Sequence, residues 1–307
     1  MTHRIDVEAS AEAVYRIVSD VELWPLYFPP TIRAERVERF GSEERIQLWA
    51  MANGELRTWQ SKRWLYPQQY HITFEQALPS APVALMGGAW WIDQNDDGTC
   101  SVRLDHYYRA VDDDPAVLEF IARAIDANSR SELEHLKRAA ERALREPEFS
   151  VDFSDVETIR GSMEEAYDYI YDVARWPERV PHVARLEVTE NEPGLQYMSM
   201  DTRSPDGSVH TTVSGRVCDP KGLIVYKQTV LPDAFLAHTG EWRFEENEPG
   251  VITVTGRHRV ILDPDGLAKL PRPPASPEAA RQAVRHALGT NSRTTMARAK
   301  EFVEARK

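Results

Sequence analysis

The 307-residue sequence has few cysteines, no long apolar run and no excess of positive charge. Its two cysteines, Cys100 and Cys218, lie in different halves, which excludes a disulfide framework and a cysteine-rich zinc site. No apolar run approaches the roughly 20 residues that a membrane-spanning helix needs. The net charge is −12, from 37 lysines and arginines against 49 aspartates and glutamates. This is the wrong sign for a protein that mainly grips phosphate backbones, so we expect no nucleic-acid partner and no membrane segment.

Other signals are absent as well. Residues 1–8 contain no apolar segment behind a basic one, so we expect no signal peptide and a cytoplasmic protein. The sequence holds no nucleophile elbow, phosphate-binding loop or dinucleotide fingerprint. The spacing of its histidines is not typical of metal ligands. We therefore expect neither a metal nor a cofactor, and any catalysis should be acid–base and electrostatic.

The strongest signal that is present is an internal repeat. The segment DVELWP at 20–25 is echoed by DVARWP at 172–177, so Trp24 and Trp176 are 176 − 24 = 152 residues apart. A period this long indicates a duplicated domain, because solenoid repeats span about 20–50 residues. We predict two domains, 1–147 and 148–307, joined near Arg145–Phe149. Other pairs at the same offset are Trp90 with Trp242, Gly98 with Gly250, and His106 with His258.

Each half shows the same order of predicted elements. A short strand (4–7 or 157–160) precedes a helix that Ser10 or Ser162 caps and that stops at the Trp-Pro pair. Alternating segments then predict antiparallel strands, and a long helix closes each half. This order predicts an α+β fold in which a curved sheet wraps around the long helix and encloses a pocket. The predicted strands of the first half are 45–51, 57–66, 70–75, 89–94 and 100–109; the turn signals are Asn53-Gly54, Asp96–Gly98, Asp206-Gly207 and Pro249-Gly250; the long helices begin at Asp114-Pro115 and Ser276-Pro277.

One strand face carries an unusual arginine. In the strand 57–66 the period of two puts Trp59, Ser61 and Arg63 on one face. An arginine that stacks on an aromatic side chain at the surface would explain this pattern. The second half repeats it, however, as Thr212, Ser214 and Arg216, and the recurrence favours an arginine that faces a polar cavity.

Histidines and asparagines recur on the elements expected to surround the pocket. His106 and His258 share strand faces with apolar residues, so each is either a hydrogen-bonded core residue or a general base. Asn128 and Asn291 interrupt the apolar stripe of the two closing helices. Each amide either orients a ligand carbonyl or bonds the helix to the sheet.

These residues resemble the aromatase/cyclases of bacterial type II polyketide synthases in their di-domain form, over nearly the whole chain. The resemblance implies two tandem START-related helix-grip domains with an interior pocket. It also implies a cofactor-independent enzyme that promotes first-ring aldol closure and dehydration of a poly-β-ketone on an acyl carrier protein, by a C7–C12 closure of a ketoreduced chain. The motifs that carry it are Ser10-x-Glu12-x-x-Tyr15 followed by Trp24-Pro25, then Trp59-x-Ser61-x-Arg63, His106 and Asn128-Ser129.

The resemblance also implies roles. Arg63 would point into a hollow beneath the closing helix and stabilise the enolate and the alkoxide, while Ser61 and His106 would hold carbonyls or relay protons, and Asn128 would orient the chain. The second half has Thr212 where the first has Trp59, so we expect chemistry in the first domain and a structural or second-step role for the second. Pocket walls would come from Trp24, Tyr27, Trp59 and Tyr108; the second-domain equivalents are Ser214, Arg216, His258 and Asn291.

Partners follow from the same resemblance, namely an acyl carrier protein and other synthase subunits. Because carrier proteins are acidic and this chain is too, docking would need a local basic patch. Two rival interpretations are a non-catalytic carrier or sensor of a hydrophobic or aromatic molecule and a scaffold for synthase subunits. The candidate docking residues are Arg33, Arg36, Arg39 and Arg45.

Overall fold

The computed structural model describes residues 1–52, 54–145, 147–203 and 207–306. Of residues 143–145 and 147 it describes the backbone only. The chain divides into two compact units, of which the first comprises Met1–Ala50 and Arg57–Pro147 and the second Met51–Leu56 and Glu148–Lys307. Of the predicted turns and join, Asn53, Asp206 and Glu146 lie outside the described residues. No helix in the described part of the chain is long and apolar enough to cross a membrane.

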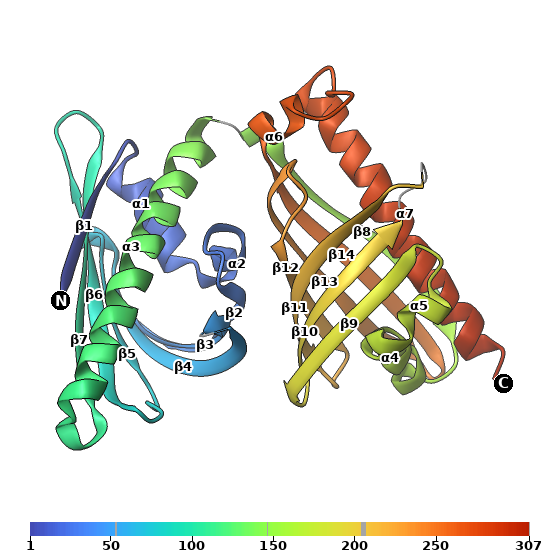
Figure 1. Ribbon diagram of the computed structural model, residues 1–307, viewed down its shortest axis with the longest axis horizontal. Coiled ribbons are helices and arrows are strands. Elements are labelled where there is room, and N and C mark those ends of the chain that lie inside the picture. Colours follow the sequence, from blue (N-terminus) through green and yellow to red (C-terminus); the bar gives the residue numbers. More distant parts are fainter. Residues whose placement is uncertain (53, 146, 204–206, 307) are drawn as a thin grey trace. The chain divides into compact units, whose positions relative to one another are not determined.

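The first unit is a seven-stranded antiparallel sheet with one long helix across it (Figure 1). The strand order is β1-β7-β6-β5-β4-β3-β2, so the first and last strands of the unit are neighbours. The elements are β1 (Thr2–Val7), α1 (Ala11–Ser19), α2 (Trp24–Tyr27), β2 (Thr31–Phe40), β3 (Glu43–Ala52), β4 (Glu55–Tyr66), β5 (His71–Gln76), β6 (Val83–Gln94), β7 (Cys100–Ala110) and α3 (Pro115–Arg145).

The second unit repeats this plan in the order β8-β14-β13-β12-β11-β10-β9. The predicted α+β fold of two tandem helix-grip domains is thereby confirmed. Its elements are β8 (Ser150–Arg160), α4 (Met163–Tyr171), α5 (Trp176–Arg179), β9 (Val183–Glu192), β10 (Leu195–Arg203), β11 (Val209–Asp219), β12 (Leu223–Val230), β13 (Phe235–Glu248), β14 (Val251–Leu262), α6 (Pro264–Ala268) and α7 (Pro277–Glu304).

Local capping fixes where the helices begin. The Ser10 and Ser162 hydroxyls accept backbone N–H groups at the first turns of α1 and α4, as predicted. The Trp-Pro pairs do not end these helices, which corrects the prediction. Asp20 follows the last residue of α1, and Trp24-Pro25 instead opens the short helix α2. Proline fits the first turn of a helix because its missing N–H is not needed there.

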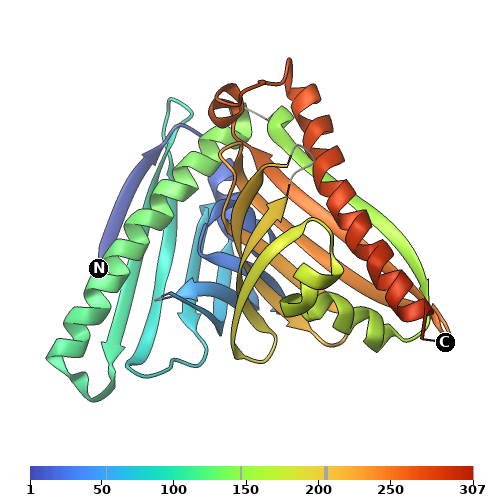
Figure 2. The same ribbon diagram turned by 45° about the vertical axis from the view of Figure 1, so that its right-hand side comes forward.

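The long helices α3 and α7 each lie along the sheet of their own unit, as Figure 2 shows from a second angle, and each buries one stripe of side chains. Asp114 caps α3 through the backbone N–H groups of Ala116 and Val117, and Ser276 caps α7 through that of Ala279. Full burial of one apolar side chain contributes about 1.5–3 kcal/mol, so the stripe anchors each helix. The buried stripe of α3 consists of Ile121, Ile125, Ser129, Leu133, Leu136 and Ala140.

Strand pairing aligns four equivalent positions into one row in each unit. Neighbouring strands lie about 4.8 Å apart, so the arginine and the histidine at the two ends of a row are separated by about 14 Å on the same sheet face. In the first unit the row is Arg63 on β4, Phe74 on β5, Gly88 on β6 and His106 on β7. In the second unit it is Arg216, Tyr226, Gly240 and His258.

Candidate active site

Arg63 lies at the buried end of its row and binds the end of α1. Its side chain is 2 % exposed, and its two Nη atoms donate to the carbonyl oxygens of Val18 (3.0 Å) and Ser19 (2.9 Å). Nη2 also lies 3.1 Å from Oε1 of the buried Glu44. Burial lowers the pKa of Arg63 to about 10 and Glu44 opposes that shift, so the guanidinium stays charged at neutral pH. The carbonyls at a helix C-terminus carry partial negative charge, which makes this a favourable place for a buried cation.

Arg216 makes the same arrangement in the second unit. It donates to the carbonyl oxygens of Ile170 (2.9 Å) and Tyr171 (3.2 Å) at the end of α4. Gln196 takes the place of Glu44, and its Oε1 accepts a hydrogen bond from Arg216. Both arginines therefore hold the first helix of their unit on the sheet.

This placement gives Arg63 partners at the end of α1 that its sequence pattern did not predict. The carbonyls of Val18 and Ser19 and the Glu44 carboxylate contact its two Nη atoms, whereas Nε has no hydrogen-bond partner among the described residues. The Ser-x-Arg repeat thus has a structural cause, since a buried guanidinium must be paired in each unit.

The other predicted residues near Arg63 also have local partners. Ser61 is buried and donates to the Glu75 carbonyl at 3.0 Å. The Trp24 ring lies 5.3 Å from the Arg63 guanidinium, and its N–H donates to the carbonyls that end α1. Trp59 packs against the apolar cluster around Val21. Trp24 and Tyr27 are half-buried beside the main core of the unit. The polar atoms of Ser61 and Trp24 thus have backbone partners within the fold.

His106 at the far end of the row meets the long helix. Its Nδ1 lies 3.4 Å from the hydroxyl of Ser129 on α3, and its ring meets Phe74 edge to face at 5.5 Å between centroids. Tyr108, two residues on, packs under the first half of α3 with Ile121. Burial, with smaller effects of His3 and the N-terminal ammonium, lowers the pKa of His106 to about 4, so the ring is neutral at pH 7.

Asn128 does not face the sheet, which corrects its predicted role. Its side chain is exposed, whereas that of Ser129 is 1 % exposed. One residue along a helix is a rotation of about 100°, so only one of the two neighbours faces inward. The second unit repeats this choice, because Ser292 is buried and Asn291 is only half-buried.

Glu132 is a titratable group of α3 that the sequence analysis missed. It lies three residues after Ser129 and four before Leu136, so it belongs to the inward flank of the helix. Burial raises the pKa of this half-buried carboxyl to about 7. Among the described residues it has no hydrogen-bond or ion-pair partner. The sequence signal that could have identified Glu132 is a carboxylic acid that lies next to the apolar stripe of the closing helix.

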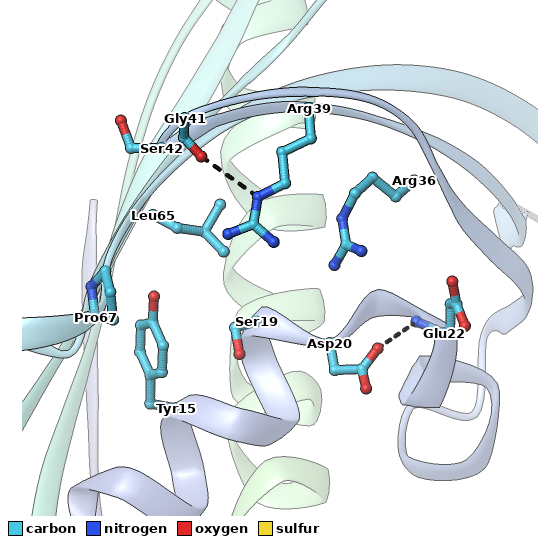
Figure 3. A pocket seen from close by; sticks show the side chains of 10 residues that line it. All are labelled: Tyr15, Ser19, Asp20, Glu22, Arg36, Arg39, Gly41, Ser42, Leu65 and Pro67. Carbon is cyan, nitrogen blue, oxygen red and sulfur yellow. Dashed lines mark hydrogen bonds between the residues drawn. The ribbon is translucent and has the colours of Figure 1, made fainter.

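A pocket of about 570 Å³ lies at the end of α1 (Figure 3). One of its lining residues, Ser19, accepts a hydrogen bond from Arg63 through its carbonyl. Arg36 and Arg39 extend into it from β2 towards Ser19 and Asp20, and Arg36 links it to Glu44 through a 2.7 Å ion pair. The buried Tyr15 hydroxyl has no partner among the residues that the structure describes, so it can donate to a ligand oxygen. The pocket residues are Tyr15, Ser19, Asp20, Glu22, Arg36, Arg39, Gly41, Ser42, Leu65 and Pro67.

In the second unit, Ser214, Arg216 and His258 lie on the corresponding sheet, whereas the fourth predicted equivalent, Asn291, lies on α7. Ser214 and Arg216 are 3 % and 1 % exposed. His258 is also buried, and its ring stacks on Phe153 of β8 at 5.0 Å between centroids.

Comparisons with known proteins agree over the whole chain. The family described as "Polyketide cyclase / dehydrase and lipid transport" matches residues 1–141 and, through a second profile of the same description, residues 159–286. The granaticin polyketide synthase bifunctional cyclase/dehydratase of Streptomyces violaceoruber is 37 % identical over 98 % of this chain and 93 % of its own. The actinorhodin counterpart of Streptomyces coelicolor is 38 % identical over 96 % and 94 %.

Two solved structures are similar over their full length. The di-domain aromatase/cyclase BexL from the BE-7585A biosynthetic pathway is 46 % identical, with a TM-score of 0.91 and coverage of 100 % of this chain and 99 % of that one. The di-domain aromatase/cyclase StfQ from the steffimycin pathway is 33 % identical, with a TM-score of 0.86 and the same coverage.

The raised pKa of Glu132 predicts a pH-dependent stability. Its folded pKa of about 7 exceeds its ordinary value of 4.5, so the folded state binds the proton more tightly. The unfolding free energy should therefore fall as pH rises from about 4.5 to 7 and level off above that. Glu132→Gln should remove this loss and stabilise the protein by about 1–2 kcal/mol at pH 8 but not at pH 4. Urea unfolding across pH measures it.

Glu134→Gln, at an exposed position of the same helix, is the matched control and should leave the pH dependence unchanged. Parallel curves for the wild type and Glu132→Gln would contradict the assignment of a raised pKa to this carboxyl.

Proposed function

The chain belongs to the polyketide cyclase/dehydrase family, as a di-domain aromatase/cyclase of type II polyketide synthases, and on that premise we propose its reaction. It closes the first ring of a poly-β-ketone by an aldol reaction between C7 and C12 of a ketoreduced chain, and the ring then loses water. The substrate is carried on an acyl carrier protein. Full-length likeness to a di-domain aromatase/cyclase, at 46 % identity, is the observation that carries this proposal.

Ring closure needs a base, a donor for the attacked ketone and one fold of a flexible chain. A methylene between two ketones is acidic enough for a side-chain base whose pKa lies near the working pH. Glu132 has such a pKa, about 7, and takes the proton in this proposal. When Ser129 donates to Nδ1 of His106, the proton of the neutral ring lies on Nε2, which then donates to a ketone oxygen.

Arg63 has a positioning role here. It holds the end of α1 and, through Glu44, orients Arg36 at the wall of the pocket. The Tyr15 hydroxyl supplies a donor in that pocket for a ketone oxygen of the folded chain. Holding reacting groups in one geometry contributes several kcal/mol to such reactions, which suits a site whose main task is orientation.

The candidate docking arginines differ in their pairing. Arg33, Arg36 and Arg45 each lie within 4 Å of a carboxylate, at 2.6, 2.7 and 3.6 Å. Arg39 is exposed and has no carboxylate partner in the described part of the chain. Its charge is therefore the one among the four that is available to an acidic carrier protein.

The direct test is a minimal polyketide synthase reconstituted with and without this protein. The wild type should redirect the products to the C7–C12 ring, and His106→Phe should lower the rate of ring closure about 100-fold because a ketone-binding donor is lost. His286→Phe, at an exposed position of α7, is the control. An unchanged product profile with the wild type, alongside binding of an aromatic ligand, would overturn the proposal in favour of a non-catalytic carrier.

Charge reversal tests the docking residue. Arg39→Glu should raise the KM for the carrier-bound substrate about tenfold at low salt and leave kcat nearly unchanged, because rim charges act mainly on encounter. Arg123→Glu, at an exposed position of α3, provides the matched change elsewhere. If both variants give the wild-type KM, the carrier does not dock at Arg39.

A further inference from the structure

The inner face of the second sheet is more polar than that of the first. Offsets of 152 place Tyr226 where the first unit has Phe74, and His238 where it has Met86. The row positions agree, because Tyr226 pairs with Arg216 as Phe74 pairs with Arg63. Two apolar side chains of the first unit thus correspond to a phenol and an imidazole in the second.

These side chains form one hydrogen-bonded cluster with His258. The Tyr226 hydroxyl lies 3.0 Å from Nδ1 of His258, and Nε2 of His238 lies 3.0 Å from the same nitrogen. Gly240 makes this contact sterically possible, because a Cβ at that position would collide with the Tyr226 ring. The cluster is assembled across three neighbouring strands, so the sheet itself holds its geometry.

Several buried polar atoms of this unit have no hydrogen-bond partner among the described residues. His258 and His238 are 5 % and 2 % exposed, yet His258 Nε2 and His238 Nδ1 have no hydrogen-bond partner among the described residues. Buried polar atoms are normally satisfied, so an inner face that leaves several orphaned is built for a polar occupant. The other orphaned atoms of this face and of α7 above it are Thr212 Oγ1, Gln228 Oε1 and Ser292 Oγ.

All three members of the cluster are uncharged at neutral pH. Burial lowers the pKa of His258 to about 4, with Asp155 opposing and Arg285 adding to the shift, and it lowers the pKa of His238 further below its ordinary value. Burial raises the pKa of Tyr226, while the charge of Arg216 in the same row acts against that rise. A neutral imidazole can accept a proton and a phenol can donate one, and Arg216 favours the phenolate that results.

We propose that Tyr226, His238 and His258 form a second acid–base site, which removes water from the cyclised β-hydroxy ketone. This assignment rests on the proposed function, because the substrate is the product of the ring closure. His258 Nε2 takes the proton from the carbon beside the ketone, the C–O bond of the β-hydroxyl breaks as the C=C bond forms, and Tyr226 protonates the leaving oxygen to give water. The Nδ1 proton of His258 then passes to the phenolate along their 3.0 Å contact, which regenerates the phenol and leaves His258 neutral with its proton on Nε2. Loss of the Nε2 proton to water and return of a proton to Nδ1 reset the relay.

His238 is a positioning residue in this site. It shares the Nδ1 of His258 with Tyr226 and so fixes the ring that receives the proton. The first unit cannot run the same relay, because Phe74 and Met86 neither donate nor accept a proton. The two units therefore have different tasks, with ring closure in the first and loss of water in the second.

The test uses the variants that the first unit itself suggests. Tyr226→Phe and His238→Met introduce the residues found at the equivalent positions of the first unit, which limits steric disturbance. In the reconstituted synthase, Tyr226→Phe should slow dehydration about 100-fold or more and accumulate a cyclised product one water heavier by mass spectrometry. The rate and regiochemistry of ring closure should stay at their wild-type values.

His238→Met should slow dehydration less and shift its pH profile, a change that a purely structural role would not produce. Tyr197→Phe removes another hydroxyl from the same sheet, one that lies 3.3 Å from Thr229, and is the matched control. Wild-type dehydration by a folded Tyr226→Phe variant would overturn the proposal. Its failure is distinct from that of the proposed function, which would instead show as wild-type protein that does not redirect ring closure.

Discussion

A buried guanidinium at the end of the first helix is the interaction on which each unit depends. Arg63 and Arg216 are 2 % and 1 % exposed, and each donates to two carbonyls of a helix end that would otherwise be left unsatisfied inside the protein. An unpaired buried charge would cost several kcal/mol. The arginine is therefore surrounded by the two carbonyls, the aromatic ring of the Trp-Pro motif and the side chain of Glu44 or Gln196. The contacts of this arginine fix the position of the first helix on the sheet and thereby the wall of the pocket.

Comparison of the two duplicated units shows which features belong to the fold and which to the chemistry of each unit. The row that joins arginine to histidine across four strands is the same in both units, and glycine occupies its third position both times. What differs is the residue that lies over that glycine. In the first unit this residue is a phenylalanine, which forms no hydrogen bond, so Nδ1 of His106 contacts the Ser129 hydroxyl instead. In the second unit the hydroxyl of Tyr226 hydrogen-bonds Nδ1 of His258 directly. One scaffold can thus present a carbonyl-binding site and a proton relay.

The sequence predicted the frame better than the site. The 152-residue offset, the caps Ser10 and Ser162 and the inward face of Ser61 and Arg63 are local or periodic signals, and the fold they predict is confirmed. β2 and β9 were missed because the alternation of apolar and charged residues in each strand is short and is followed by mostly polar residues. The sequence analysis chose Asn128, and not Ser129, as the inward-facing polar residue of α3, because periodicity defines the inward face of a helix only to within about one residue. Glu44 was out of reach, since its contact with Arg63 depends on how strands pair.

We propose that Arg63 positions the site and does not stabilise the reacting oxygen. The most direct measurement is the rate of ring closure per folded molecule for Arg63→Met combined with Glu44→Leu, which removes both charges together and so avoids an orphaned buried ion. Circular dichroism gives the folded fraction. We expect a less stable protein whose folded molecules close the ring within about tenfold of the wild-type rate. A variant that folds fully and loses more than about a thousandfold in rate would contradict it, because a loss of that size is typical of removing a group that binds the developing oxyanion.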